Sequence, residues 1–116
     1  MKKNPIKDKS YSFALKSINT YKNLQQKQEF ILSKQFLRSA TSIGANIEEG
    51  IQAESKKDFI HKLSISQKEA FETHYWIRLL RDADYLDKQI AMDLIKDCEE
   101  IQKIITAILK TSKKNN

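Results

Sequence analysis

Two glutamates on one predicted helix have the clearest potential for chemistry in this sequence. Glu69 and Glu72 are three residues apart, so on a helix they share one side, where paired carboxylates can act in acid–base catalysis or bind a metal ion. A bundle that binds two metal ions needs a Glu-x-x-His pattern on two helices and two further glutamates. Only Asp58 and His61 approximate this spacing, and no acid stands three residues before His74. We therefore expect no metal site.

The other reactive residue types also lack partners. Cys98 is the only cysteine, which excludes a disulfide within the chain and a multi-cysteine metal site. Its place in an apolar pattern predicts a buried side chain rather than a nucleophile. The two glycines, Gly44 and Gly50, are isolated, and we recognise neither a phosphate-binding glycine loop nor a Ser-His-Asp arrangement. The sequence predicts a protein that is not an enzyme and uses no cofactor.

No segment has the character of an export or membrane signal. Residues 1–8 are basic, but no continuous apolar stretch follows them, as a signal peptide would require. The most apolar segment, Ile104–Leu109, is far too short to span a bilayer. We expect a cytoplasmic protein with no membrane partner.

Basic residues are concentrated in the first part of the chain. The net charge is +6 and the pI is about 9.4, which favours an acidic partner such as RNA or DNA. The candidate nucleic-acid contacts are the N-terminal lysines together with one aromatic residue for base stacking: Lys2, Lys3, Lys7, Lys9, Lys16, Lys27 and Phe13. No base-reading motif is present, so binding would follow shape and backbone. The alternative is an ordinary lysine-rich surface exposed to solvent.

Four helices must position these residues. The 116 residues contain only two glycines and one proline, which is far fewer than average and favours long helices. Apolar residues recur at helical spacing in four segments, at about 10–26, 33–50, 55–83 and 87–111. Amphipathic helices with short links predict an all-α fold, namely an antiparallel up-and-down four-helix bundle in a single domain.

Local signals predict how these helices begin and end. Ser33 is the expected N-cap of the second helix, and Gly50 is expected to end it in a left-handed conformation. Ser55 and Asp58 form a capping-box pattern at the start of the third helix, and Asp87 can cap the fourth. The core-facing stripe predicted for the first helix, opposite its lysines, comprises Tyr11, Ala14, Leu15, Ile18, Tyr21 and Leu24 or Gln25.

The third helix has apolar residues on two sides. Leu63, Ala70 and Ile77 suit the bundle core, whereas Trp76 and Leu79 lie on the far side. A helix that is apolar on both sides lies between neighbours, so we expect self-association. The alternative is a wide bundle that covers the second side itself.

The second helix carries charges that oppose its dipole. Arg38 lies near its start and Glu49 near its end, whereas cations are favoured at the C-terminus and anions at the N-terminus. Such a violation predicts partners elsewhere, so we expect Arg38 to pair with Glu69 or Glu72, within or between subunits. Removal of one partner of a buried pair costs about 3 to 5 kcal/mol.

Three segments of the sequence together resemble a known protein family. Residues Arg38–Gly50, Ser55–Leu63 and Gln67–Ile77 resemble the bacterial four-helix-bundle proteins called 23S rRNA-intervening-sequence proteins, and the likeness is close over about 35–80. The resemblance implies a ring-like homopentamer and does not imply an enzyme. A related branch, the accessory variability proteins of diversity-generating retroelements, binds nucleic acid and a reverse transcriptase.

Taken together, the resemblance and the patterns indicate a non-enzymatic homo-oligomer that binds nucleic acid or a nucleic-acid-processing protein. The alternative is a structural protein–protein scaffold without nucleic-acid binding. The residues expected in the bundle or subunit interface lie on the second and third helices: Arg38, Ser42, Asn46, Glu49, Glu69, Glu72, Trp76 and Leu79.

Overall fold

The computed structural model describes residues 3–115, and within them the secondary structure is entirely helical. It has four helices: α1 Pro5–Gln26, α2 Leu32–Ile51, α3 Lys56–Asp82 and α4 Lys88–Lys114. The prediction of a four-helix, all-α fold is confirmed. The start of α1 differs most from the prediction, because Asn4 caps the Lys7 amide at 3.3 Å and Pro5 occupies the first helical position, where its missing N–H does no harm.

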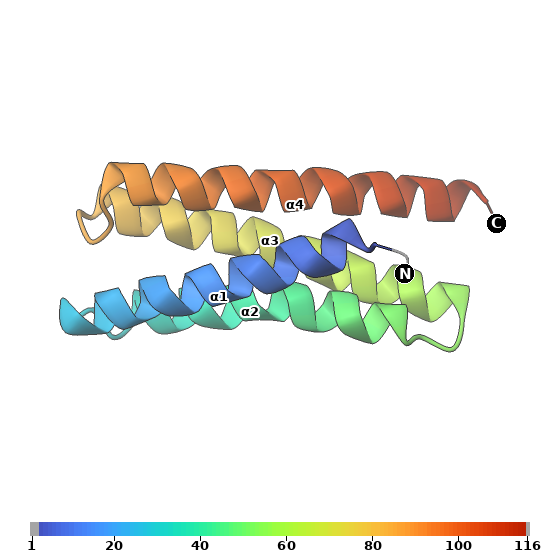
Figure 1. Cartoon of the computed structure of the whole chain (residues 1–116), viewed down its shortest axis with the longest axis horizontal. Coiled ribbons are helices and arrows are strands. Elements are labelled where there is room, and N and C mark those ends of the chain that lie inside the picture. The colour runs from blue at the N-terminus through green and yellow to red at the C-terminus, as the bar shows by residue number, and fades with distance from the viewer. Residues whose placement is uncertain (1–2, 116) are drawn as a thin grey trace.

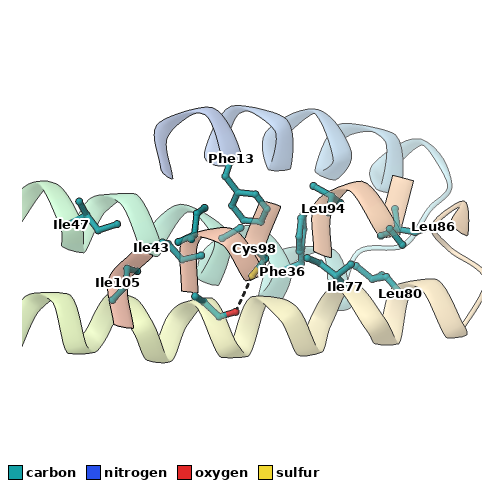
Figure 2. Packing of buried hydrophobic residues seen from close by; sticks show 14 of the residues in the cluster. Phe13, Phe36, Ile43, Ile47, Ile77, Leu80, Leu86, Leu94, Cys98 and Ile105 are labelled. Atoms are coloured by element: carbon teal, nitrogen blue, oxygen red, sulfur yellow. Dashed lines mark hydrogen bonds between the residues drawn. The ribbon is translucent and has the colours of Figure 1, made fainter. Parts of the chain in front are cut away.

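The helices form an elongated bundle of 47 × 27 × 19 Å. Successive helices are joined by short loops at alternate ends of the molecule (Figure 1). Helices α1 and α3 each pack against both α2 and α4, and between residues 3 and 115 the diagonal pairs do not contact. Aromatic and aliphatic side chains from all four helices fill the centre (Figure 2), among them Phe13, Phe36, Ile43, Ile77, Leu94 and Ile101.

Helix α1 packs with a different face from the predicted one. Its core side includes Ser10, Phe13 and Ser17, whereas Tyr11 is 59% and Leu15 50% exposed. The predicted stripe of Tyr11, Ala14, Leu15, Ile18 and Tyr21 is therefore wrong as a core face, whereas Leu24, at its end, is fully buried as predicted. The buried serine hydroxyls bind carbonyls of their own helix, Ser10 to Lys7 O and Ser17 to Phe13 O, which removes the cost of burying them.

Small residues on both helices let α1 and α2 approach closely. A Cβ atom at Gly44 of α2 would lie 3.3 Å from Ser10 Oγ of α1, which is a tight contact. Larger residues at Ser10 or Gly44 would separate the helices, so apolar periodicity alone misassigns the face of α1.

Gly50 does not end α2 in a left-handed conformation, so that prediction is wrong. The helix continues to Ile51, and a Cβ at Gly50 would lie 2.8 Å from Leu63 Cδ2 of α3. Glycine is present here because α3 packs close to it.

Left-handed residues instead follow α1 and α3. Gln28 and Asp84 have φ values of 62° and 66°. At both ends two backbone hydrogen bonds close a Schellman motif: Gln28 N to Gln25 O and Glu29 N to Leu24 O after α1, and Asp84 N to Arg81 O and Tyr85 N to Leu80 O after α3.

A carboxylate, not the predicted Ser33 hydroxyl, caps the start of α2. Glu29, only 7% exposed, accepts from the amides of Ser33 at 2.6 Å, Leu32 at 3.1 Å and Ile31 at 3.3 Å. The Ser33 hydroxyl donates to Glu29 O at 2.7 Å instead. Burial raises the pKa of Glu29, but these hydrogen bonds outweigh burial and lower the pKa below its ordinary value. Ser55 and Asp87 cap α3 and α4 as predicted.

We expect Gln28→Gly and Asp84→Gly each to raise the free energy of unfolding by about 0.5 to 1 kcal/mol, because glycine adopts positive φ without a Cβ penalty. Urea denaturation measures the change. Gln26→Gly is the matched control: it places glycine inside α1 and should destabilise. A loss of stability on Gln28→Gly would contradict the conformational explanation.

We expect Glu29→Gln to lower the free energy of unfolding by about 1 kcal/mol at pH 7, because the neutral amide loses the charge-assisted caps. The folded-state pKa of Glu29 is lowered, so its contribution is present above pH 4.5 and is lost as the pH falls through the folded-state pKa. The difference between wild type and variant should therefore shrink in acid. Exposed Glu54→Gln is the control, and a pH-independent difference would count against a capping carboxylate.

Candidate functional site

The residues with catalytic potential are engaged in structural contacts. Glu69 and Glu72 both bind Arg38. Cys98 Sγ donates to Ala70 O at 3.2 Å, and burial raises the pKa of this thiol to about 12, so it stays protonated at neutral pH and is a poor nucleophile. Across residues 3–115 no group of three or more histidines, cysteines and acids is arranged to hold a metal ion.

Among residues 3–115, none of the helices combines the length and the apolar character needed to cross a membrane.

Two of the lysines predicted to bind nucleic acid form ion pairs between α1 and α4. Lys9 forms an ion pair with Glu100 at 2.5 Å. Lys16 binds Asp97 at 2.6 Å and Asp93 at 3.0 Å, and the hydrogen bond to Asp97 is the main cause of its raised pKa. These lysines therefore join α1 to α4, and their charges are largely balanced within the chain.

The remaining candidates have varied surroundings. Phe13 is 1% exposed and belongs to the core, so the prediction that it stacks on bases is wrong. Lys27 donates to Tyr85 O at 2.9 Å and links the two loops at one end of the bundle. Lys3 and Lys7 are exposed and form no ion pair with the described residues, whereas Lys2 lies outside residues 3–115.

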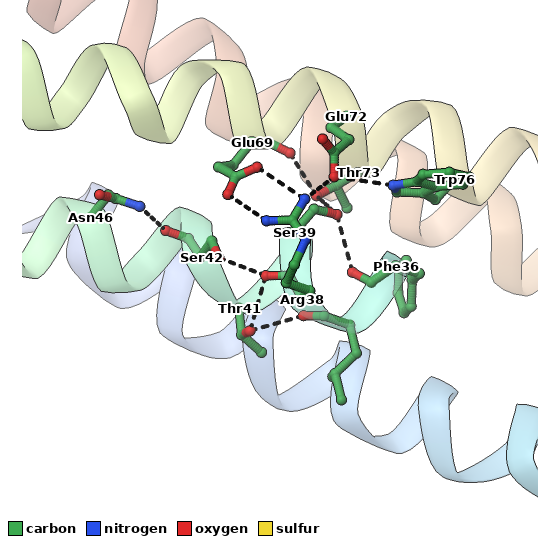
Figure 3. A network of polar contacts seen from close by, with 11 residues as sticks. Phe36, Arg38, Ser39, Thr41, Ser42, Asn46, Glu69, Glu72, Thr73 and Trp76 are labelled. Carbon is green, nitrogen blue, oxygen red and sulfur yellow. Dashed lines mark hydrogen bonds and ion pairs between the residues drawn. The ribbon is translucent and has the colours of Figure 1, made fainter. Parts of the chain in front are cut away.

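Arg38 forms the polar centre of the α2–α3 face (Figure 3). Its Nη1 lies 3.0 Å from Glu69 Oε2, and Nη2 binds Glu72, which also accepts from Trp76 Nε1 at 3.2 Å. The hydrogen bond to Glu69 is the main cause of the raised pKa of Arg38. The predicted pairing is confirmed within one chain.

The Arg38 network is not a buried pair. Half of the Arg38 side chain is exposed, as is 38% of Glu72. The cost of 3 to 5 kcal/mol expected for a buried pair is therefore too high, because solvent screens these charges.

The other predicted interface residues extend the same face. Ser42 Oγ donates to Arg38 O at 2.7 Å, Asn46 Nδ2 donates to Ser42 O at 2.8 Å, and Glu49 binds Lys62 at 3.0 Å. Trp76 is half-buried against the core, and Leu79 is partly exposed. A single chain therefore already covers part of the Trp76 side chain.

Sequence patterns missed several exposed apolar residues. Tyr11 and Leu15 of α1 point away from the core of the bundle, and Phe71 and Tyr75 of α3 are 60% and 47% exposed. Both α3 residues lie on the side of the helix away from Leu63 and the core, and a helical projection that weighted exposed aromatics could have found them.

Comparisons with known proteins give one consistent result. The family model described as 23S rRNA-intervening sequence protein matches residues 2–107. The chain is also similar to a crystal structure of a protein of unknown function from the S23 ribosomal protein family of Bacteroides thetaiotaomicron. The two share 48% identity with a TM-score of 0.89, over 90% of this chain and 98% of that one. Among curated proteins, no significant match was found.

We expect Arg38→Ala to lower the free energy of unfolding by about 1 kcal/mol or less, as for other half-exposed ion pairs. A double-mutant cycle with Glu69→Ala in denaturant should give a coupling of about 0.5 to 1 kcal/mol that weakens in high salt. Lys34→Ala, an exposed change one turn earlier on α2, is the control. A coupling of zero would show that the network adds no stability.

Proposed function

Because the chain belongs to the 23S rRNA-intervening sequence protein family, we propose that it is a non-enzymatic, cytoplasmic homo-oligomer that binds RNA or DNA. The observation that carries the proposal is the number of lysines and arginines left without ion pairs. Carboxylates bind five basic residues, namely Lys9, Lys16, Arg38, Lys62 and Arg81. Residues 3–115 contain 20 of the 21 lysines and arginines, and most of these 20 are outside this set and are available to neutralise phosphates.

Self-association is the second part of the proposal. Each chain is an antiparallel up-and-down bundle with apolar residues that reach the surface on two different faces: exposed Tyr11 and Leu15 on α1, and partly exposed Leu79 beside half-buried Trp76 on α3. Contact between unlike faces of neighbouring copies closes a ring when the rotation allows it. This arrangement suits the pentamer that the family resemblance implies, and repetition would multiply weak phosphate contacts.

A structural scaffold is the second candidate function. The same exposed apolar residues support it, since they suit contacts with protein as well as contacts between copies. The two functions differ in their response to salt. Phosphate contacts weaken steeply as salt rises, whereas an apolar interface responds little.

Light scattering followed by a binding titration tests the proposal on one sample. We expect a mass several times that of the 13.5 kDa chain, together with binding of labelled RNA or DNA oligonucleotides that weakens steeply from about 50 to 200 mM salt. Competition by unlabelled oligonucleotide controls for binding to the dye. A multimer that binds no oligonucleotide at low salt would favour the scaffold, and a stable monomer would contradict the proposed assembly.

A further inference from the structure

We infer that the outer side of α3 and α4 is a binding surface for single-stranded nucleic acid. This inference rests on the proposed function and gives it a location other than the N-terminal lysines. The α3–α4 surface, as we call it, comprises two exposed aromatic residues and four cations: Phe71, Tyr75, Arg78, Lys96, Lys103 and Lys110.

The aromatic residues are held on a rigid helix. Phe71 and Tyr75 are one turn apart on α3 and are 60% and 47% exposed. The Tyr75 ring contacts Trp76 edge-on at 5.2 Å between centroids, and the Arg78 guanidinium lies 5.7 Å from the centre of the Tyr75 ring. Exposed aromatic faces beside cations are the usual platform on which proteins stack unpaired bases.

Three lysines follow one another along α4. Lys96, Lys103 and Lys110 are seven residues apart, which is about 10 Å per step on a helix. They are exposed, and they lie opposite the core residues Leu94 and Cys98 in helical projection. No carboxylate of residues 3–115 forms an ion pair with any of the three.

Nearby carboxylates are already bound to other groups. Glu99 binds His74 Nε2 at 3.0 Å, and His74 Nδ1 accepts from Arg78 Nε at 3.0 Å. Glu100 binds Lys9 of α1 at 2.5 Å. Lys9 is the main cause of the lowered pKa of Glu100, and the charges of Lys96 and Lys103 add to it, but neither lysine forms a direct ion pair with Glu99 or Glu100.

The contact between α3 and α4 also leaves two buried hydrogen-bonding groups without a partner. The amide of Gln67 donates to Gln102 O and Thr106 Oγ1, but Gln67 Oε1 and Gln102 Nε2 are buried without a partner. Gln102 also lines an open hollow with Glu99, Lys103, Thr106 and Ala107. Rotation of the Gln102 amide toward this hollow would pair its N–H with a phosphate or base oxygen, so a ligand could satisfy a group that the chain does not.

These features favour a single strand over a duplex. Stacking on Phe71 needs a base that is not already stacked and paired, whereas a duplex would use the lysines alone. Recognition would be tolerant of sequence, because every base has an aromatic face and every nucleotide a phosphate.

The test compares full-length variants in oligonucleotide titrations across a salt series. We expect Phe71→Ala to weaken binding of single-stranded RNA and DNA by roughly 5- to 150-fold and to leave duplex binding unchanged. Phe30→Ala, which removes another aromatic residue with 48% exposure, is the matched control and should have no effect. Stronger binding of RNA than of DNA would indicate contact with the 2′-hydroxyl.

The lysines are tested by their effect on the salt slope. The triple variant Lys96→Gln, Lys103→Gln and Lys110→Gln should reduce the slope by about 2, since each lost phosphate contact removes about 0.7 for a single strand. The control neutralises three exposed lysines that belong neither to this surface nor to the N-terminal candidates, Lys22, Lys34 and Lys56, and should leave the slope nearly unchanged.

The results of these titrations distinguish failure of the proposed site from failure of the proposed function. If the wild type binds but the α4 triple variant and Phe71→Ala bind equally well, the α3–α4 surface is wrong while the proposed function stands. An equal loss of slope in the control triple would also overturn the location. If the wild type binds no oligonucleotide at low salt, the proposed function fails and this site fails with it.

Discussion

The close approach of α2 to its two neighbours is the constraint on which the structure depends. It requires small side chains at the contacts, Gly44 beside Ser10 of α1 and Gly50 beside Leu63 of α3. Nearer the start of α2 than either glycine, Ser39 accepts from Thr73 of α3 at 2.8 Å in the buried interior. Because interiors are packed as densely as crystals, a side chain at Gly44 would crowd Ser10, and one at Gly50 would force the Leu63 side chain to move. The α2–α3 contact, which includes the Arg38 network, is the most extensive in the bundle.

The close approach of the helices explains why some large apolar side chains lie on the surface of the bundle. Helix α1 presents serines to α2 so that the backbones can approach, and its larger residues Tyr11 and Leu15 consequently face outward. Helix α3 likewise uses Ala70 and Thr73 on its inner side and exposes Phe71 and Tyr75. The surfaces available for partners thus follow from the need for small residues within the bundle.

Sequence reasoning succeeded where a feature depends on local chemistry. Helical periodicity gave the four helices, capping patterns gave Ser55 and Asp87, and the misplaced charge of Arg38 predicted its pairing with Glu69. It failed where a distant helix decides the outcome. Phe13 is buried because it shares the core side of α1 with Ser10, which lies beside Gly44 of α2. The error at Ser33 is a local one, since the carboxylate of Glu29, four residues earlier, caps the same amides.

The ion pairs of the lysines that join α1 to α4 affect how the folded bundle opens. Helix α1 contacts α4 less than any other neighbouring pair does, and the ion pairs of Lys9 and Lys16 across this contact are 32 to 54% exposed. Proteins open in cooperative units that begin with the least stable contacts. The order of amide hydrogen exchange in the native state should follow this hierarchy: the bundle should open first along the seam between α1 and α4, while the contact between α2 and α3 persists longest.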